Sequence, residues 1–201
     1  GSGHALMQAR DGPRGSFLLV NGDQVIDSEI VKAVSTAHDT TATLSIVEGA
    51  EADSYGAVRV ADDEITTLTE QPASGEFRLF NAGVYAFTQE IFETLETLSV
   101  DRGELPLTDA IQALIDDETQ TVSGVRTDSF WMDATHPWDL LSLARELLGR
   151  GWVEPAADND GCYVADTAHI HPDATLVGPV VVDSDAVIEA GAVVGPYAAI
   201  G

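Results

Sequence analysis

The sequence predicts an α/β chain in two parts. We expect a mostly parallel sheet covered by helices over residues 1–150, and the start of a parallel β-helix over residues 162–201. Short apolar runs alternate with amphipathic stretches through the first part, and an aliphatic residue recurs at every sixth position of the second. Residues 151–161 between them are rich in Gly, Pro, Asp and Asn, which is typical of a linker.

The elements expected in residues 1–150 follow from hydrophobic periodicity. Phe17–Val20 is a short apolar strand, and Ser28 is placed to N-cap the helix that follows. A hairpin is expected over residues 55–68, where two alternating runs flank Asp62-Asp63. The other expected elements are strands at 41–47, 84–87, 122–125 and 130–133 and helices near 89–97, 108–117 and 137–149. Such alternation is typical of a Rossmann-like sheet with helices on both faces.

The last part of the chain repeats every six residues. Aliphatic side chains stand at Val164, Ile170, Leu176, Val182, Ile188, Val194 and Ile200. Four positions after each of the first six lies a small or β-branched residue: Ala168, Ala174, Val180, Ala186, Ala192 and Ala198. This period fits neither a helix nor a single strand, but it fits short strands that turn a corner every six residues. The segment resembles the hexapeptide-repeat left-handed β-helix.

The repeat also predicts that the chain is a piece of a longer protein. Three hexads make one coil, so residues 164–201 supply about two coils, and the pattern runs to Ile200-Gly201. Stacked repeats usually need at least three units to bury a continuous core. We therefore expect the β-helix to continue in the parent protein.

Composition excludes several functional classes. The chain has 34 Asp and Glu residues against 9 Lys and Arg, a formal net charge of −25, which disfavours nucleic-acid binding. No apolar run approaches the roughly 18 residues of a membrane span, and the single Cys162 suits a reducing cytoplasm. The acidic residues are dispersed and Lys32 is the only lysine, which is typical of adaptation to high cytoplasmic salt.

Two acidic residues are expected at the carboxyl ends of strands, where ligands collect in open α/β sheets. Asp23 follows the strand at 17–20 through Asn21-Gly22, and Asp133 ends the strand at 130–133. Two carboxylates at neighbouring strand ends can hold one Mg²⁺. Spacing alone does not favour this metal site over the alternative, in which Asp23 is only a turn residue and Asp133 only leads into a helix.

Seven short motifs occur in one order along the chain. They are Gly1-Ser2-Gly3-His4-Ala5, Leu19-Val20-Asn21-Gly22-Asp23, Tyr55-Gly56, Glu70-Gln71-Pro72, Asn81-Ala82-Gly83-Val84-Tyr85, Gly103-Glu104 with Thr108-Asp109, and Trp131-Met132-Asp133 through Pro137-Trp138-Asp139-Leu140-Leu141. Together with the hexad tail, they resemble the sugar-1-phosphate nucleotidylyltransferase family, including its glucose-1-phosphate thymidylyltransferases and N-acetylglucosamine-1-phosphate uridylyltransferases. The tail resembles that of bifunctional members with an appended acetyltransferase. The resemblance implies a cytoplasmic enzyme that transfers a nucleotidyl group from UTP or dTTP to glucose-1-phosphate or N-acetylglucosamine-1-phosphate and releases pyrophosphate.

The resemblance also implies roles for individual residues. Asp23 and Asp133 match the catalytic positions that hold Mg²⁺, the implied cofactor. The positions that match the nucleotide site are Gly1, Ser2, Asn21 and Gly22. The positions that match the sugar site are Gly56, Glu70, Asn81 and Gly83. His4 and His136 are disfavoured as general bases, because an attacking phosphate oxygen needs no deprotonation.

Two departures from the family pattern lead to further expectations. Gln71 stands where the family usually has a Lys that contacts the sugar phosphate. The Gly-rich loop G-x-G-T-R-x-x-P, which cradles the triphosphate, does not occur in the sequence, so residues 1–201 are expected to be inactive alone. Two alternatives stay open: the acetyltransferase of a bifunctional enzyme, and a non-catalytic regulatory homologue. A homo-oligomer is expected, with a trimer through the β-helix as one form.

Overall fold

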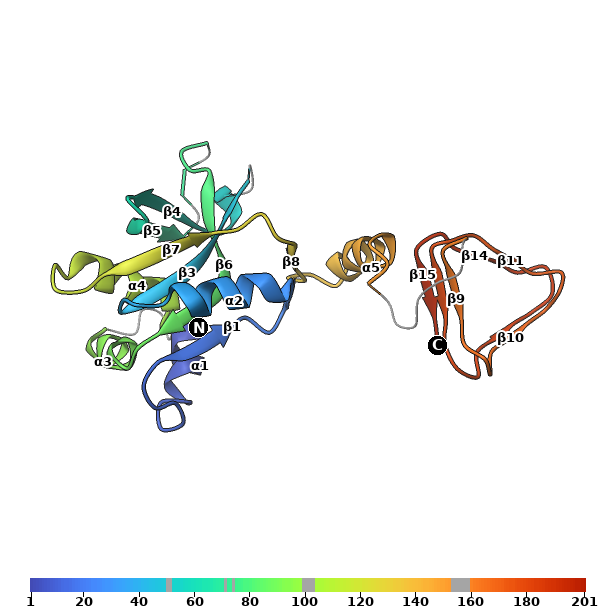
Figure 1. The fold of residues 1–201 in the computed structure, drawn as a ribbon, viewed down its shortest axis with the longest axis horizontal. Coiled ribbons are helices and arrows are strands. Elements are labelled where there is room, and N and C mark those ends of the chain that lie inside the picture. Colours follow the sequence, from blue (N-terminus) through green and yellow to red (C-terminus); the bar gives the residue numbers. More distant parts are fainter. Residues whose placement is uncertain (50–51, 71, 74, 99–103, 153–159) are drawn as a thin grey trace. The chain divides into compact units, whose positions relative to one another are not determined.

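The computed structural model describes residues 1–49, 52–70, 72–73, 75–98, 104–152 and 160–201 (Figure 1). The chain divides into two compact units, Gly1–Trp131 and Met132–Gly201, which we call unit 1 and unit 2. The linker expected at 151–161 lies largely outside the described residues, and the boundaries given above stay predictions. None of the helices in the described ranges combines the length and the apolar character needed to cross a membrane.

Unit 1 contains a six-stranded sheet in the order β1-β6-β3-β7-β5-β4. Its strands are β1 (Phe17–Val20), β3 (Ala42–Glu48), β4 (Gly56–Ala61), β5 (Glu64–Glu70), β6 (Leu79–Phe87) and β7 (Val122–Arg126). A short strand, β2 (Gln24–Ile26), follows β1 outside this sheet. β3 is parallel to β7, whereas β6 is antiparallel to both β1 and β3, and β4 and β5 form the expected hairpin. The sheet is mixed, so the prediction of a mostly parallel sheet is wrong.

The mixed sheet follows from the lengths of the connections. Parallel neighbours need a crossover of a dozen or more residues, whereas β4 and β5 are joined directly at Asp62-Asp63. Both aspartates have positive φ angles, 50° and 66°, which two-residue hairpin turns favour and which Asp tolerates. The short 3₁₀ turn η1 (Ala52–Ser54) and this hairpin occupy the chain between β3 and β6. β6 then returns beside β3 in the opposite direction.

Helices cover both faces of the sheet, as predicted. The first face packs against α1 (Ser2–Met7), α3 (Glu90–Thr97) and α4 (Leu107–Asp116), and the second packs against α2 (Ser28–Ala37). Alternate residues of β6 enter the two cores, with Tyr85 and Phe87 in the first and Val84 and Ala86 in the second. The N-cap of α2 is Asp27, not Ser28 as expected, because the Asp27 carboxylate accepts from the Glu29 N–H at 3.1 Å.

Unit 2 contains α5 (Asp139–Gly149) and a stack of short strands. It begins at Met132, within the short strand β8 (Trp131–Asp133). The stacked strands are β9 (Cys162–Val164), β10 (His169–Ile170), β11 (Thr175–Leu176), β12 (Val180–Val182), β13 (Val187–Ile188), β14 (Val193–Val194) and β15 (Ala198–Ile200). They pair in parallel as β9-β12-β15, β10-β13 and β11-β14, and Val180 pairs with both Cys162 and Ala198. Each partner lies three hexads away in sequence, which confirms the predicted coil.

The repeated aliphatic side chains form the core of these coils. Val182 and Ile188 are buried, and the partly buried residues packed against their cluster include Ile170, Leu176, Val194 and Ile200. Val182 lies between Val164 and Ile200 in the stack, so it has neighbours on both sides. Val164 has such a neighbour on one side and remains 36% exposed. Val182, which has neighbours on both sides, is thus more deeply buried than Val164.

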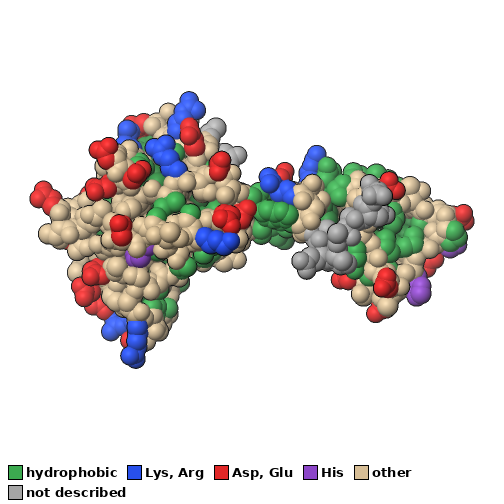
Figure 2. Space-filling model, viewed as in Figure 1, with side chains coloured by type: hydrophobic (Ala, Val, Ile, Leu, Met, Phe, Trp, Pro, Cys, Tyr) green, Lys and Arg blue, Asp and Glu red, His purple; other side chains and the backbone are tan. Residues whose placement is uncertain are grey.

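Acidic side chains are scattered over the face of the molecule shown in Figure 2. Some are paired with cations, as in the contacts Lys32–Glu29 at 2.7 Å and Arg59–Glu76 at 3.4 Å, both between exposed side chains. Nine Lys and Arg residues cannot pair one to one with 34 carboxylates. The surface therefore keeps a large uncompensated negative charge, and exposed ion pairs contribute little to offset it.

Candidate functional site

The candidate site is built around an irregularity in β6. Leu44 and Ile46 of β3 pair with Tyr85 and Asn81 of β6. One residue of β3, Ser45, therefore lies opposite three residues of β6. Bulges of this kind bend a strand, re-aim its side chains and are frequent beside active sites. We call residues 81–85 the β6 bulge.

Hydrogen bonds from three elements hold the β6 bulge in place. The Gly83 N–H donates to Asn81 Oδ1 at 3.0 Å, and the Asn21 N–H, just after β1, donates to the Gly83 carbonyl at 3.0 Å. The Trp131 indole N–H donates to the Ala82 carbonyl at 2.6 Å. The bulge therefore ties the end of β1 and the indole of Trp131 to β6. Asn21 and Asp23 are brought to the same end of the sheet as Asn81.

Gly83 is required at the bulge for two reasons. Its φ of +74° lies in the left-handed region that disfavours side chains, and an added Cβ would lie 2.4 Å from Gln24 Nε2 and 2.6 Å from Asn21 Nδ2. The predicted sugar-site glycine and the predicted nucleotide-site asparagine are therefore in contact. Sequence reasoning missed Gln24, which no motif marks.

Gly83→Ala is expected to disturb ligand binding more than folding. The new methyl group meets only the ends of the Gln24 and Asn21 side chains, which can swing away at the expense of the site. Gly75→Ala is the matched control, since Gly75 has a φ of +79° and open space around its Cβ position. Backbone strain should lower the free energy of unfolding of both variants by about 1 kcal/mol, as measured by urea unfolding. Only Gly83→Ala should also weaken binding of a nucleotide or sugar phosphate in calorimetry; equal binding by the two variants would contradict this role.

The buried hydroxyl of Tyr85 has an amide as its hydrogen-bond partner and lies within range of the charges of two carboxylates. Burial raises the pKa of Tyr85 to about 12; the hydrogen bond from Asn81 Nδ2, at 2.6 Å, acts to lower it, and the charges of Glu70 and Asp23 raise it further. A charge shifts a pKa appreciably only from nearby. Asn81 thus contacts the Tyr85 hydroxyl, and the charges of Glu70 and Asp23, two further predicted site residues, extend to it.

The β4–β5 hairpin supplies the next part of the site. Gly56 pairs with Glu70, and a Cβ at Gly56 would lie 3.7 Å from Glu70 Oε1 and 3.6 Å from Thr108 Cγ2 at the start of α4. Thr108 Oγ1 and Gln24 Oε1 are buried and have no hydrogen-bond partner within the described part of the chain. Buried polar atoms are normally satisfied, so two such atoms suit a region that receives ligand or water.

An aromatic cluster lies beside the bulge. Tyr55 stacks on Phe80, with ring centroids 4.8 Å apart, and Trp131 meets both rings edge-on at 5.2 and 5.3 Å. Aromatic pairs in these geometries contribute about 0.5–1.5 kcal/mol beyond burial. Tyr55 and Trp131 are parts of predicted motifs, and the structure shows that they pack together at this edge of the bulge.

Gly1 and Ser2 lie against the segment that leads into α4. A Cβ on Gly1 would lie 2.9 Å from the Leu105 carbonyl oxygen, and Ser2 Oγ accepts from the Leu107 N–H at 3.2 Å. The Ser2 hydroxyl thus satisfies one of the free N–H groups at the start of α4. Both residues have a packing role, and their contact with a nucleotide stays a prediction.

The metal site at Asp23 and Asp133 stays a prediction. Asp23 belongs to unit 1 and Asp133 to unit 2, where its carboxylate accepts from Thr135 Oγ1 at 2.8 Å. In the described ranges, no group of three or more His, Cys, Asp and Glu side chains is arranged to hold a metal. Mg²⁺ commonly takes one or two carboxylates together with substrate phosphates, and the exposed Asp23 fits one such ligand. Gln71 lies outside the described residues.

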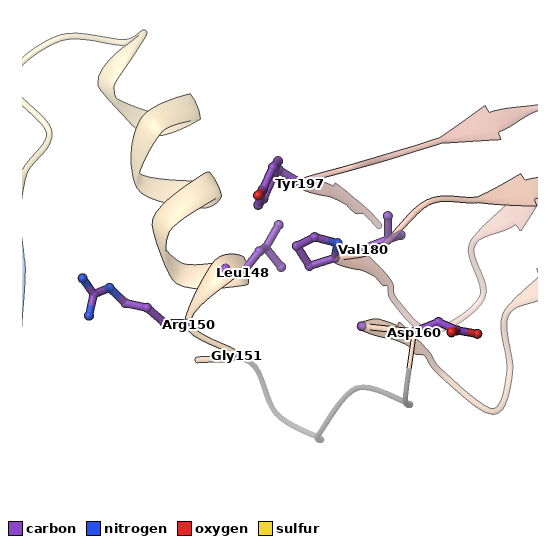
Figure 3. Close-up of a pocket in the computed structure, with 10 residues that line it drawn as sticks. Leu148, Arg150, Gly151, Asp160, Val180 and Tyr197 are labelled. Carbon is purple, nitrogen blue, oxygen red and sulfur yellow. The ribbon is translucent and has the colours of Figure 1, made fainter.

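Unit 2 has a pocket of about 570 Å³ between the end of α5 and the coils (Figure 3). Leu148 and Tyr197 face it from the two sides, and its charged lining residues are Arg150 and Asp160. The Arg145 guanidinium lies over the Tyr197 ring at 4.8 Å, which helps to hold α5 against the coils. The rest of the lining is mainly glycine and apolar, so we assign no chemistry to this pocket.

Comparisons with known proteins agree with this architecture. The profile of the family described as nucleotidyl transferase matches residues 1–149. The bifunctional protein GlmU of Methanococcus aeolicus is 35% identical over 150 residues, which are 74% of this chain and 36% of that protein. The bifunctional sugar-1-phosphate nucleotidylyltransferase/acetyltransferase of Sulfurisphaera tokodaii is 26% identical over 196 residues, 95% of this chain and 44% of that protein. The chain thus spans less than half the length of either relative.

Solved structures share the fold. The UTP-bound UGPase from Acinetobacter baumannii superimposes with a TM-score of 0.61 at 24% identity, covering 77% of this chain and 57% of that one. The inositol-1-phosphate CTP transferase from T. maritima gives a TM-score of 0.64 at 17% identity, covering 75% of this chain and 62% of that one. At these identities the likeness concerns the fold alone.

Proposed function

The chain belongs to the nucleotidyl transferase family, and from that premise we propose that unit 1 binds the sugar-1-phosphate substrate of a nucleotidylyltransferase. The observation that carries the proposal is the β6 bulge, which holds Asn81 against Tyr85 and Gly83 against Asn21, with the charges of Glu70 and Asp23 in range of the Tyr85 hydroxyl. A carboxylate and an amide provide acceptors and donors for sugar hydroxyls. A side chain at Gly83 would collide with Asn21 and Gln24 beside Asn81. The substrates proposed are UTP or dTTP with glucose-1-phosphate or N-acetylglucosamine-1-phosphate.

The proposed reaction needs little covalent participation by the protein. An oxygen of the sugar phosphate attacks the α-phosphorus of the nucleoside triphosphate, and the bond to the β-phosphate oxygen breaks with loss of pyrophosphate. The attacking oxygen is already anionic, so catalysis depends on positioning two polyanions and neutralising charge. Asp23, with Asp133 as the second proposed ligand, would hold Mg²⁺, which supplies that neutralisation when bound. Asn21 and Gly22 follow β1 directly and are proposed for the nucleotide, with Gly1 and Ser2.

Glu70→Gln tests the sugar side directly. The substitution keeps the shape of the side chain but removes the charge that strengthens a hydrogen bond from a sugar hydroxyl. We expect binding of glucose-1-phosphate or N-acetylglucosamine-1-phosphate, measured by calorimetry in high salt, to weaken about 10-fold or more.

Glu64→Gln is the matched control for this test. Glu64 begins the same strand, is exposed and pairs with Ala61 at the hairpin turn, so its loss removes the same charge away from the bulge. Its effect on affinity should be small. If the unsubstituted chain binds neither sugar phosphate, or if both variants weaken binding equally, the proposed sugar site is wrong.

The tail supports a second proposal, that unit 2 begins the left-handed β-helix of a bifunctional enzyme with an acetyltransferase part. The support is the parallel coil stack and the alignment with the Sulfurisphaera protein, which extends over 95% of this chain. Assembly through such coils, with a trimer as one form, is part of this proposal. Light scattering in high salt would test it, and a strictly monomeric chain would count against assembly.

A further inference from the structure

We propose that Tyr85 is a positioning residue for the sugar-1-phosphate, holding the amide of Asn81 in the one orientation that leaves a donor and an acceptor free for the substrate. Tyr85 acts through Asn81 and does not touch the ligand. This inference rests on the proposed function, since Tyr85 would support Asn81, a side chain of the proposed sugar site.

The two polar ends of the Asn81 amide are each held by one hydrogen bond. Nδ2 donates one of its two protons to the Tyr85 hydroxyl at 2.6 Å, and Oδ1 accepts from the Gly83 N–H at 3.0 Å. A primary amide has two N–H donors and two acceptor lone pairs. Within the described part of the chain, one N–H and one lone pair of Asn81 therefore remain for a ligand. A flipped amide would oppose its own N–H to that of Gly83, so the observed orientation is fixed.

The bulge is what makes this contact. In a regular strand, residues four apart are about 13 Å from each other along the strand, too far for Asn81 to reach Tyr85. The β6 bulge places three residues opposite Ser45 and shortens that distance. The same irregularity that turns Asn81 into the site thus supplies the partner that orients it.

Tyr85 is the rigid member of the pair. Its side chain is 4% exposed, and its ring stacks on Phe87 at 5.4 Å between centroids. Its backbone pairs with Leu19 of β1 and Leu44 of β3. Asn81, by contrast, is only partly buried. Packing therefore fixes the hydroxyl, and the hydroxyl holds in place the Nδ2 end of an amide whose other end is held by the Gly83 N–H.

The hydroxyl also stays neutral under working conditions. Burial raises the pKa of Tyr85 to about 12, and the nearby carboxylates of Glu70 and Asp23 act in the same direction. At neutral pH the phenol is protonated, so it accepts from Asn81 without adding a third negative charge beside the two carboxylates. A side chain that ionised here would repel the substrate phosphate.

A double-mutant cycle tests the inference. The full chain and its Tyr85→Phe, Asn81→Ala and doubly substituted forms would be titrated with glucose-1-phosphate and N-acetylglucosamine-1-phosphate in high salt. We expect Tyr85→Phe to weaken binding about 10-fold, and to have no further effect once Asn81 is Ala, because the two residues act as one unit. Tyr163→Phe, which removes a hydroxyl from the coils of unit 2, should leave affinity unchanged.

The outcomes separate this inference from the function on which it rests. Binding that is unaffected by Tyr85→Phe, or losses that simply add in the double variant, would overturn the positioning role while leaving the sugar site intact. Absence of binding by the unsubstituted chain would overturn the sugar site and this role with it. Thermal unfolding of each variant distinguishes a lost hydroxyl from a disturbed fold, since a general disturbance would lower the midpoint and affect binding additively.

Discussion

Asp23→Asn is expected to lower Mg²⁺-dependent nucleotidyl transfer by about 10²–10³-fold, the effect typical of losing one electrostatic group at a reacting phosphate. The measurement would be made in a protein that joins this chain to a phosphate-binding loop, since the chain alone is predicted to be inactive. Asp23 follows β1, is exposed, and its charge acts on the Tyr85 hydroxyl within the site. Asn keeps the size of the side chain but removes the negative charge that a divalent cation requires.

Asp27→Asn is the control for this charge. Asp27 lies four residues further on and caps α2 through the Glu29 N–H, and Asn caps helices about as well as Asp. Its turnover should therefore stay near that of the parent. Pyrophosphate release would be followed over a series of Mg²⁺ concentrations, where Asp23→Asn should also shift the dependence to higher Mg²⁺. Equal losses in both variants, or a loss that no Mg²⁺ concentration affects, would remove Asp23 from the metal site.

The elements that sequence predicts well are those with a local repeat or turn. The hexads place the coil strands, because an aliphatic side chain every sixth residue has few other uses. Asp62-Asp63 places the hairpin, because Asp tolerates positive φ. Direction and order of the strands are not local properties. The prediction of a mostly parallel sheet failed because nothing within 79–87 indicates that β6 pairs with β1 and β3 at once.

The site likewise has some features that the local sequence indicates and others that depend on contacts distant in sequence. The motifs identify Asn81, which contacts Tyr85, and also Glu70 and Asp23, whose charges act on the Tyr85 hydroxyl. The bulge itself was not predicted, because it exists only as a difference in register between β6 and β3. Helix α1 was missed as well. Glycine disfavours helix, so Gly3 gives no sign of one. Glycine is needed there because the Cβ of any other residue would lie 2.7 Å from the carbonyl oxygen of Leu105, which is distant in sequence.

The surface charge predicts a strong dependence of stability on salt. At a net charge of −25, folding brings like charges together, and their repulsion acts over a Debye length of about 10 Å at 0.1 M salt. At 1 M it falls to about 3 Å, so only neighbouring charges interact. If screening relieves several kcal/mol, the unfolding midpoint of a chain of this size should rise by roughly 10 °C or more between 0.1 and 2 M KCl.

A charge-neutralised variant separates screening from a general salting-out of apolar surface, which also stabilises folded proteins. Asp11, Asp62 and Asp63 are exposed, and Asn tolerates the positive φ of the last two, so Asn at all three positions keeps the fold. Circular dichroism would follow thermal unfolding of both forms over the KCl series. If screening dominates, the variant should be more stable at low salt and gain less as salt is added. Equal slopes in the two forms would show that the salt acts on apolar surface, and that the acidic composition stabilises by another route.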